Sequence, residues 1–168
     1  TVVYTLTNPP SSSLYVKCAP SIVTLYSQWD DMTTAHGTGF IVSGGGYIVT
    51  AGHLVRRRTQ AGAYSAASGV SVTLWSSGRV YSTRVVCIDG RADVAVLKIE
   101  AVGLPPLTIH AVSNIHHGDV VTIIGNAFGV DSHSMSAGVV RNPRWKDPSV
   151  QTLLTNILTT IPTSNGIS

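Results

Sequence analysis

Short runs of apolar and β-branched residues, separated by polar or glycine-rich turns, recur along the chain. No segment repeats its apolar residues with the period of a long amphipathic helix. Short strands with turn signals between them are typical of a sandwich or a barrel, so we predict an all-β fold. The predicted strands cover residues 21–26, 37–42, 47–51, 70–75, 79–88, 94–99, 119–125, 134–141 and 151–159.

Two of the predicted connections are hairpin turns. Residues 43–46 read Ser-Gly-Gly-Gly, and glycine tolerates the positive φ that a tight hairpin needs. A second hairpin turn is predicted at residues 76–78, before the strand at 79–88. The alternation along that strand predicts that one of its faces is buried. The alternating sets are Tyr81, Thr83, Val85 and Cys87 on one side and Ser82, Arg84 and Val86 on the other.

The first 20 residues differ from the rest of the chain. They contain Asn8-Pro9-Pro10 followed by three serines, so we predict an extended polar arm over residues 1–20. The segment Gly103-Leu104-Pro105-Pro106 is the best candidate for a boundary between two barrels. A chain of 168 residues can bury one large core or two small packed ones. With two cores, this segment would divide the chain into an arm at 1–20, a first β-barrel at 21–103 and a second at 104–168.

The chain is 43% hydrophobic and only 11% charged, against a usual charged share of about 25%. A surface with so few charges is expected to rely on partners to cover it. The formal net charge is +3, and Arg56-Arg57-Arg58 carries much of that excess. Three basic residues are too few to argue for nucleic-acid binding, so we interpret this cluster as a solvated loop.

Cysteine and histidine spacing indicates neither a metal site nor a cofactor. Cys18 and Cys87 lack the spacing of metal ligands, and no carboxylate pattern accompanies His116, His117 and His133. The scarcity of cysteine fits either a reducing compartment or a group of proteins that do without disulfides, and of the two we favour an intracellular location. No signal peptide is visible, and no apolar run approaches the roughly 20 residues that span a bilayer, so we expect no membrane span.

Three residues supply candidate catalytic chemistry, in the order His53, Asp93, Ser168. A histidine, with a usual pKa of about 6.5, can take the proton of a serine hydroxyl and pass it to a leaving amine. A carboxylate behind the histidine fixes its tautomer and stabilises the imidazolium. His53 follows the strand at 47–51 on a glycine turn, and Asp93 heads an apolar run in which an unpaired charge would be costly to bury.

Each candidate also has a plainer interpretation. His53 read alone would be a satisfied core histidine, Asp93 a turn residue before a strand, and Ser168 a serine on a frayed terminus. Asp89 is the rival carboxylate, although the adjacent glycine makes it an ordinary turn aspartate. Ser164 is the weaker candidate nucleophile, because no glycine lies two residues before it.

Five segments in this order resemble the chymotrypsin-fold serine peptidases and, within them, the HtrA (Deg) branch. They read Gly37-Thr38-Gly39-Phe40-Ile41, Thr50-Ala51-Gly52-His53, Asp93-Val94-Ala95-Val96-Leu97-Lys98-Ile99, Gly125-Asn126-Ala127-Phe128-Gly129 and Ser164-Asn165-Gly166-Ile167-Ser168. The resemblance runs from about residue 20 to the end of the chain. Two features depart from the family pattern: Gly52 replaces the usual alanine, and the chain stops where Gly-Gly-Pro would follow Ser168.

The resemblance implies two antiparallel β-barrels of the chymotrypsin type, the second incomplete in this chain. It implies a trypsin-like serine endopeptidase that hydrolyses polypeptides, with His53, Asp93 and Ser168 as its triad. In this family the backbone N–H groups around the serine form the oxyanion hole, here those of Gly166 and Ser168. No cofactor is implied.

A second hypothesis comes from a different class of protein. The low charge content, the polar arm and the end of the sequence at Ser168 would also suit a protease-fold module that has lost catalysis and is held in a larger assembly. A homo-oligomer or larger assembly is therefore an expected partner arrangement, and a chain that ends at Ser168 is expected to be inactive by itself.

Overall fold

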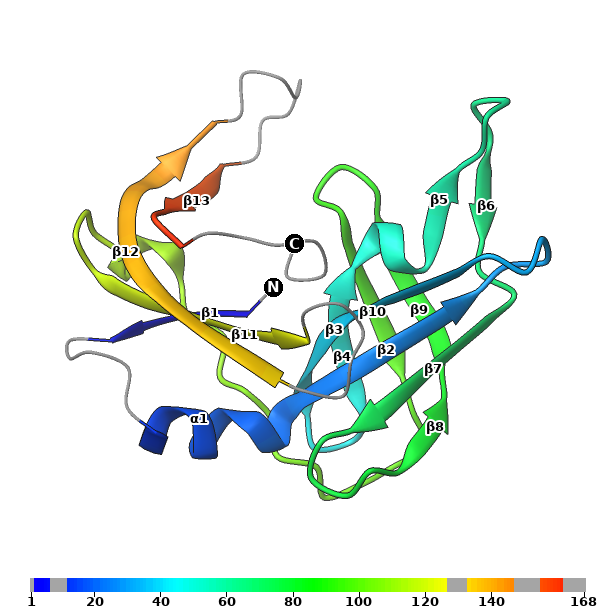
Figure 1. The fold of residues 1–168 in the computed structure, drawn as a ribbon, viewed down its shortest axis with the longest axis horizontal. Helices are drawn as coiled ribbons and strands as arrows, with labels where there is room; N and C mark the ends of the chain where they lie inside the picture. The colour runs from blue at the N-terminus through cyan, green and yellow to red at the C-terminus, as the bar shows by residue number, and fades with distance from the viewer. Residues whose placement is uncertain (1, 7–11, 127–132, 147–154, 162–168) are drawn as a thin grey trace.

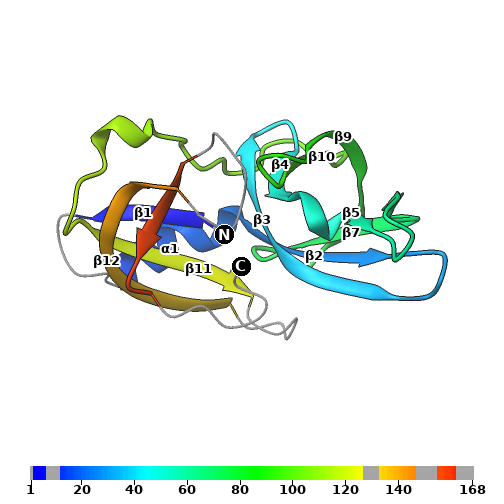
Figure 2. The same ribbon diagram turned by 90° about the horizontal axis from the view of Figure 1, so that it is seen from above.

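Two β-sheets lie side by side, and a short α-helix packs against their junction (Figure 1). The computed structural model describes residues 2–6, 12–126, 133–146 and 155–161. Seven strands form the larger sheet and four form the smaller one, which confirms the predicted all-β fold. Seen from above, the smaller sheet lies to one side of the long strand β3 (Figure 2).

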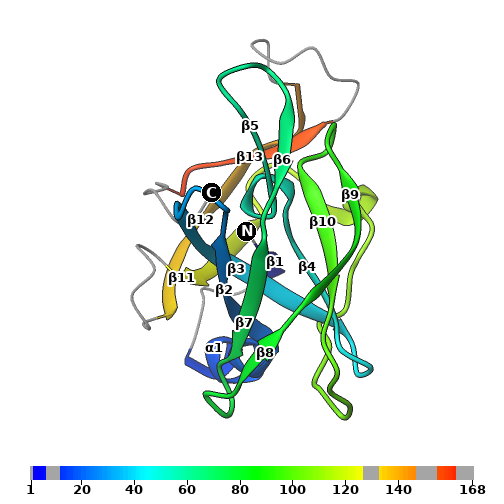
Figure 3. The same ribbon diagram turned by 90° about the vertical axis from the view of Figure 1, so that its right-hand side faces the viewer.

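The larger sheet has the strand order β8-β7-β2-β3-β4-β10-β9 (Figure 3), and all its pairs are antiparallel. Its strands are β2 (Ile22–Gln28), β3 (Thr34–Ser43), β4 (Tyr47–Ala51), β7 (Gly69–Leu74), β8 (Val80–Ser82), β9 (Arg84–Asp89) and β10 (Val94–Lys98).

The larger sheet closes into a barrel at Thr83. The two outermost strands, β8 and β9, are consecutive in the chain and only this residue separates them. The Thr83 backbone N–H and hydroxyl both donate to the carbonyl oxygen of Val70, at 2.9 and 3.2 Å. One long run of chain therefore pairs with β7 at its start and with β10 at its end, which joins the two sides of the sheet.

Alternate residues of the barrel strands point into one apolar core. Val23 and Leu25 of β2 are fully buried there, together with Ile41, Ile48 and Leu97. This arrangement follows from the period-2 geometry of a strand, in which every second side chain faces the same side. Burying one such side chain contributes about 1.5–3 kcal/mol, so the interior of the barrel is its main source of stability.

The smaller sheet has the order β1-β11-β12-β13 and a core of its own. Its strands are β1 (Val2–Leu6), β11 (Val120–Asn126), β12 (His133–Trp145) and β13 (Asn156–Thr159). Val121, Ile123, Val140 and Ile161 form its buried cluster. A third cluster of Cys18, Ile22 and Ile124 lies where β11 packs beside β2 and β3, so the two sheets share an apolar contact.

Short elements complete the described chain. The helix α1 (Ser12–Cys18) leads into the 3-10 turn η1 (Ala19–Ser21), and η2 (Gly52–Leu54) follows β4. The strands β5 (Arg56–Arg58) and β6 (Tyr64–Ala66) form a hairpin separate from both sheets. The remaining turn is η3 (Val112–Asn114).

The prediction of an extended arm over residues 1–20 is wrong for its described part. Residues 2–6 form β1, which pairs with β11, and Ser12–Cys18 forms the helix α1. Leu14, Tyr15 and Cys18 of the helix pack on the cluster at the sheet junction, and this burial outweighs the poor helix propensity of the serines. The boundary near Gly103 stays a prediction, supported by the fact that β2–β10 precede it and β11–β13 follow it.

Two further predictions are corrected. The loop expected around Arg56-Arg57-Arg58 contains the β5–β6 hairpin. The expected buried face of residues 79–88 is found only in part: Tyr81 and Thr83 are half-buried, whereas Val85 and Cys87 of the same set are exposed. The break at Thr83 and an irregular register of β9 opposite Val96 and Leu97 interrupt the simple alternation.

The turn between β3 and β4 contains a glycine, Gly46, that is packed closely against the backbone of a neighbouring segment. Gly46 has a φ of +90°, and a Cβ placed on it would lie 3.0 Å from the carbonyl oxygen of Ala101. Gly62, in the β5–β6 hairpin, has a similar φ of +80° but has nothing within 4 Å of that position.

We expect Gly62→Ala to lower the free energy of unfolding by about 1–2 kcal/mol, the cost of a left-handed conformation. Gly46→Ala should lower it by more, because the new methyl group also displaces a backbone carbonyl. Urea unfolding of both variants measures the difference. Equal losses in the two variants would show that the contact at Gly46 does not matter.

Candidate active site

His53 lies on the turn that ends β4. Its neighbours Leu54 and Val55 are 7% and 1% exposed, so the chain on the C-terminal side of the histidine is anchored in the barrel core. Gly37 of β3 leaves the space that the Leu54 side chain fills. The His53 side chain itself points outward and is 52% exposed.

Asp93 faces His53 because β4 and β10 are paired. Val94, the first residue of β10, lies opposite Ala51, the last residue of β4, so the residues just beyond these ends meet. The Gly52 N–H donates to the Asp93 carbonyl oxygen at 2.8 Å and continues the ladder by one step. Asp93 has a φ of +53°, a left-handed conformation that aspartate tolerates better than most residues.

Both oxygens of the Asp93 carboxylate are directed at His53. Oδ2 lies 2.6 Å from the ring Nδ1, and Oδ1 accepts the backbone N–H of His53 at 2.7 Å. An ionised carboxylate only accepts hydrogen bonds, so this contact places the imidazole proton on Nδ1 and leaves Nε2 with its lone pair. The pair is a histidine base in a fixed tautomer, and it is open to solvent because the Asp93 side chain is 53% exposed.

Gly52 gives the Asp93 carboxylate room. A Cβ placed on Gly52 would lie 3.1 Å from Asp93 Oδ1 and 3.3 Å from the backbone of Asp93 and Val94. Such distances are tighter than most Cβ contacts, although a shift of a few tenths of an ångström would relieve them. The glycine that replaces the family's usual alanine therefore lies directly beside the His53–Asp93 pair.

The rival carboxylate, Asp89, has a different role. Its Oδ1 accepts the backbone N–H groups of Arg91 and Ala92 at 2.8 and 3.1 Å. These hydrogen bonds hold the pKa of Asp89 below its usual value, and the one from Ala92 has the largest effect. Asp89 thus shapes the turn that carries Asp93 into place.

Two of the predicted triad residues, His53 and Asp93, are brought together, whereas Ser168, Gly166 and the rival Ser164 lie outside the described residues. Among the residues that are described, no group of three or more histidine, cysteine, aspartate and glutamate side chains could hold a metal ion. That same part of the chain has no helix long and apolar enough to cross a membrane.

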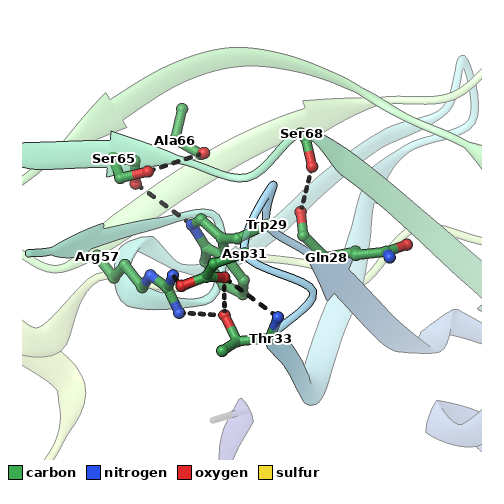
Figure 4. Close-up of polar contacts among 8 residues, drawn as sticks. All are labelled: Gln28, Trp29, Asp31, Thr33, Arg57, Ser65, Ala66 and Ser68. Atoms are coloured by element: carbon green, nitrogen blue, oxygen red, sulfur yellow. Dashed lines mark hydrogen bonds and ion pairs between the residues drawn. The ribbon is translucent and has the colours of Figure 1, made fainter.

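A second polar cluster, which the sequence did not indicate, lies between the β2–β3 turn and the β5–β6 hairpin (Figure 4). The Arg57 guanidinium pairs with the Asp31 carboxylate, donates to the Thr33 hydroxyl and lies 4.7 Å from the centre of the Trp29 ring. Trp29 is 3% exposed, and its Nε1–H donates to the Ser65 carbonyl oxygen at 3.4 Å. Arg57 is therefore a structural contact and not part of a solvated loop.

Asp31 is held in this cluster mainly by Thr33. The Thr33 hydroxyl and backbone N–H donate to Asp31 Oδ1 at 2.6 and 3.1 Å. These hydrogen bonds, together with the charge of Arg57, hold the pKa of the Asp31 carboxyl below its usual value. No sequence pattern indicates this contact, because Asp31 and Arg57 are 26 residues apart.

Comparison with known proteins gives several matches. A model of the trypsin-like peptidase domain matches residues 37–168. A protein of Halomonas elongata named "Probable periplasmic serine endoprotease DegP-like" is 38% identical over 104 residues, which cover 62% of this chain and 20% of that protein. The serine endoprotease DegS of Escherichia coli is 33% identical over 142 residues, which cover 79% of this chain and 37% of DegS.

A solved structure described as the HtrA-type protease AlgW with a decapeptide superposes with a TM-score of 0.75 at 25% identity. The match covers 92% of this chain and 52% of the AlgW chain. The chain thus spans about a fifth of the DegP-like relative, about a third of DegS and about half of AlgW.

These relatives correct the expectation of an intracellular compartment. The DegP-like proteins of Halomonas elongata and Chlamydia trachomatis are both named as periplasmic. The inference from cysteine content is wrong, because few cysteines mean only that disulfides do not hold the fold together. A barrel with fully buried residues such as Leu25, Ile48 and Leu97 has a core that is stable without such bonds.

The lowered pKa of Asp31 makes the hairpin contact sensitive to acid. A carboxyl whose pKa is lower in the folded protein stabilises the fold at any pH above its unfolded-state pKa of about 3.9. This stabilisation is lost as the pH falls through the folded-state pKa. We expect Asp31→Asn to be less stable than the parent at neutral pH, and the difference to vanish in acid, as measured by denaturant unfolding across pH. Asp30→Asn, at an exposed neighbour, is the control, and a difference independent of pH would contradict the assignment.

Proposed function

The chain belongs to the trypsin-like peptidase domain family, and we propose that it provides the histidine, aspartate and serine of a serine endopeptidase. The DegP-like, DegS and AlgW matches confirm the resemblance to HtrA-like peptidases that the motifs predicted. The observation that carries the proposal is the contact of 2.6 Å between His53 Nδ1 and Asp93 Oδ2. A histidine held in this tautomer is what a serine nucleophile requires of its base.

In the proposed mechanism, Ser168 Oγ attacks the carbonyl carbon of the scissile peptide bond while His53 Nε2 takes the hydroxyl proton. Asp93 keeps its hydrogen bond to Nδ1 and stabilises the imidazolium. His53 then gives the proton to the leaving amine as the C–N bond breaks. Water repeats the sequence on the acyl-enzyme, with His53 again as base, and releases Ser168. The backbone N–H groups of Gly166 and Ser168 are the proposed donors to the oxyanion.

The proposed substrate is a polypeptide. Support comes from the AlgW structures, which are described with a decapeptide and with a tripeptide, and from the endoprotease names of the relatives. The half-exposed His53–Asp93 pair also leaves space for a peptide to approach. The periplasmic names of the DegP-like relatives support a site of action outside the cytoplasm. Assembly into an oligomer stays a prediction.

The protease-fold module without catalysis is the alternative function. A module of that kind has no need for a histidine fixed by both oxygens of one carboxylate, whereas a peptidase needs this arrangement. The geometry of the pair therefore favours the peptidase.

Replacing Asp93 tests the role of the pair. Asp93→Asn keeps the size and the left-handed backbone but offers an N–H to the imidazole, so the tautomer is lost and kcat should fall on the order of 10³–10⁴-fold. Asp89→Asn is the matched control, because an amide oxygen can still accept the two backbone N–H groups, and its kcat should stay near that of the parent. Peptide hydrolysis under saturating substrate measures both, and a comparable fall in the two variants would refute the assignment.

Covalent labelling tests the nucleophile. A fluorophosphonate probe should modify Ser168 of the protein in its natural full length, and His53→Ala should abolish the reaction because the serine then has no base. The control variant Ser164→Ala, changed four residues before Ser168, should still be labelled at Ser168. Peptide mapping that finds the adduct on Ser164, or labelling that survives loss of the histidine, would contradict the proposed triad.

A further inference from the structure

The β5–β6 hairpin begins next to the candidate active site. β5 starts at Arg56, three residues after His53, and the hairpin projects from the same end of the barrel as this histidine turn (Figure 1). Its base is closed by the Ala67 N–H, which donates to the Val55 carbonyl oxygen at 2.9 Å. The hairpin is therefore a direct continuation of the chain segment that positions His53.

One face of the hairpin is fixed to the barrel and has its charge neutralised. Arg57 pairs with Asp31 and stacks on Trp29, as Figure 4 shows for the polar contacts. Ser68, just past the hairpin, adds two hydrogen bonds to the Gln28 carbonyl oxygen, at 2.8 Å from its N–H and 3.1 Å from its hydroxyl. These contacts hold the hairpin at a set position relative to His53.

The opposite face is cationic. Side chains alternate along a strand, so Arg56 and Arg58 point away from the face that carries Arg57. The Arg56 guanidinium lies 4.3 Å from the centre of the Tyr64 ring, and Arg58 Nε–H donates to the Gly62 carbonyl oxygen at 3.2 Å. Neither arginine forms an ion pair with any residue in the described parts of the chain.

This cationic face also reaches the turn that carries Asp93. A Cβ placed on Gly90 would lie 3.7 Å from Arg56 Cζ, so the guanidinium rests against the β9–β10 turn. The carboxylate in this turn, Asp89, already accepts the backbone N–H groups of Arg91 and Ala92. The guanidinium groups of Arg56 and Arg58 thus keep donors for a further anion.

We propose that the Arg56–Arg58–Tyr64 face of the hairpin binds an acidic side chain of the polypeptide substrate, close in sequence to the bond that is cut. The inference rests on the proposed peptidase function and adds a substrate preference to it. A guanidinium offers a planar set of donors that matches a carboxylate, and stacking on a tyrosine ring holds it ready for that contact. Two unpaired arginines are enough to bind one carboxylate. They are few for a nucleic acid, because affinity for nucleic acid grows with the number of phosphates that are neutralised.

The test uses pairs of labelled peptides that differ only by Glu or Gln at one position on either side of the cleaved bond. Fluorescence anisotropy with the His53→Ala protein measures binding without cleavage. At one position the Glu peptide should bind roughly two- to fivefold more tightly than its Gln partner. This preference should shrink at high salt, because the contact is exposed.

Arginine variants then locate the preference. Arg56→Gln combined with Arg58→Gln should abolish the difference between Glu and Gln peptides. Arg79→Gln should retain it, because Arg79 also lies over a tyrosine ring, at 5.3 Å from the centre of Tyr81, but belongs to the β7–β8 turn at the other end of the barrel (Figure 1).

The possible results separate this inference from the proposed function. Equal binding of Glu and Gln peptides at every position would overturn the inference even if the protein cleaves peptides. A preference that survives in the double variant, or an oligonucleotide that binds more tightly than the Glu peptide, would also overturn it. Failure of the parent protein to cleave any peptide would refute the peptidase function, and the binding comparison would still decide the role of the hairpin.

Discussion

The antiparallel pairing of β4 with β10 is the constraint on which the candidate site depends. His53 and Asp93 are 40 residues apart, and they meet because Ala51 and Val94 are opposite each other at the ends of these strands. The hydrogen bond from Gly52 to Asp93 extends the ladder past the last pair, and the carboxylate then receives both the backbone N–H and the ring of His53. A shift of one residue in this register would turn Asp93 to the other side of the strand.

The sequence predicted most of the barrel from local patterns of apolar residues and turns, and it predicted the His53–Asp93 pair from the order of motifs that resemble the HtrA branch. Residues 47–51 form β4 as expected, and Asp93 stands before a strand in which an unpaired charge would be costly. The helix α1 was missed because its stability comes from packing on Ile22 and Ile124, which its own sequence does not reveal. Arg57 was misinterpreted for a similar reason, since its partners Trp29 and Asp31 lie on a distant turn.

The structure divides three consecutive arginines between two roles. Arg57 holds the hairpin to the barrel, whereas Arg56 and Arg58 remain without an acidic partner among the described residues. Alternation along a short strand is sufficient to produce this division, because neighbouring side chains point to opposite faces. A count of charges in the sequence could not separate an arginine that stabilises the fold from one that is available for recognition.

The way the barrel strands pair has a consequence for the order of folding. The pairs β2–β3, β3–β4 and β9–β10 are hairpins, whose strands are neighbours in the sequence. The pairs β2–β7 and β4–β10 join strands that are distant in the sequence, and such pairs form more slowly. The contact between His53 and Asp93 belongs to the second group, because it depends on the pairing of β4 with β10. A chain in which these two strands have not yet paired would therefore contain a histidine without its carboxylate, and the base of the proposed triad would be incomplete until they pair.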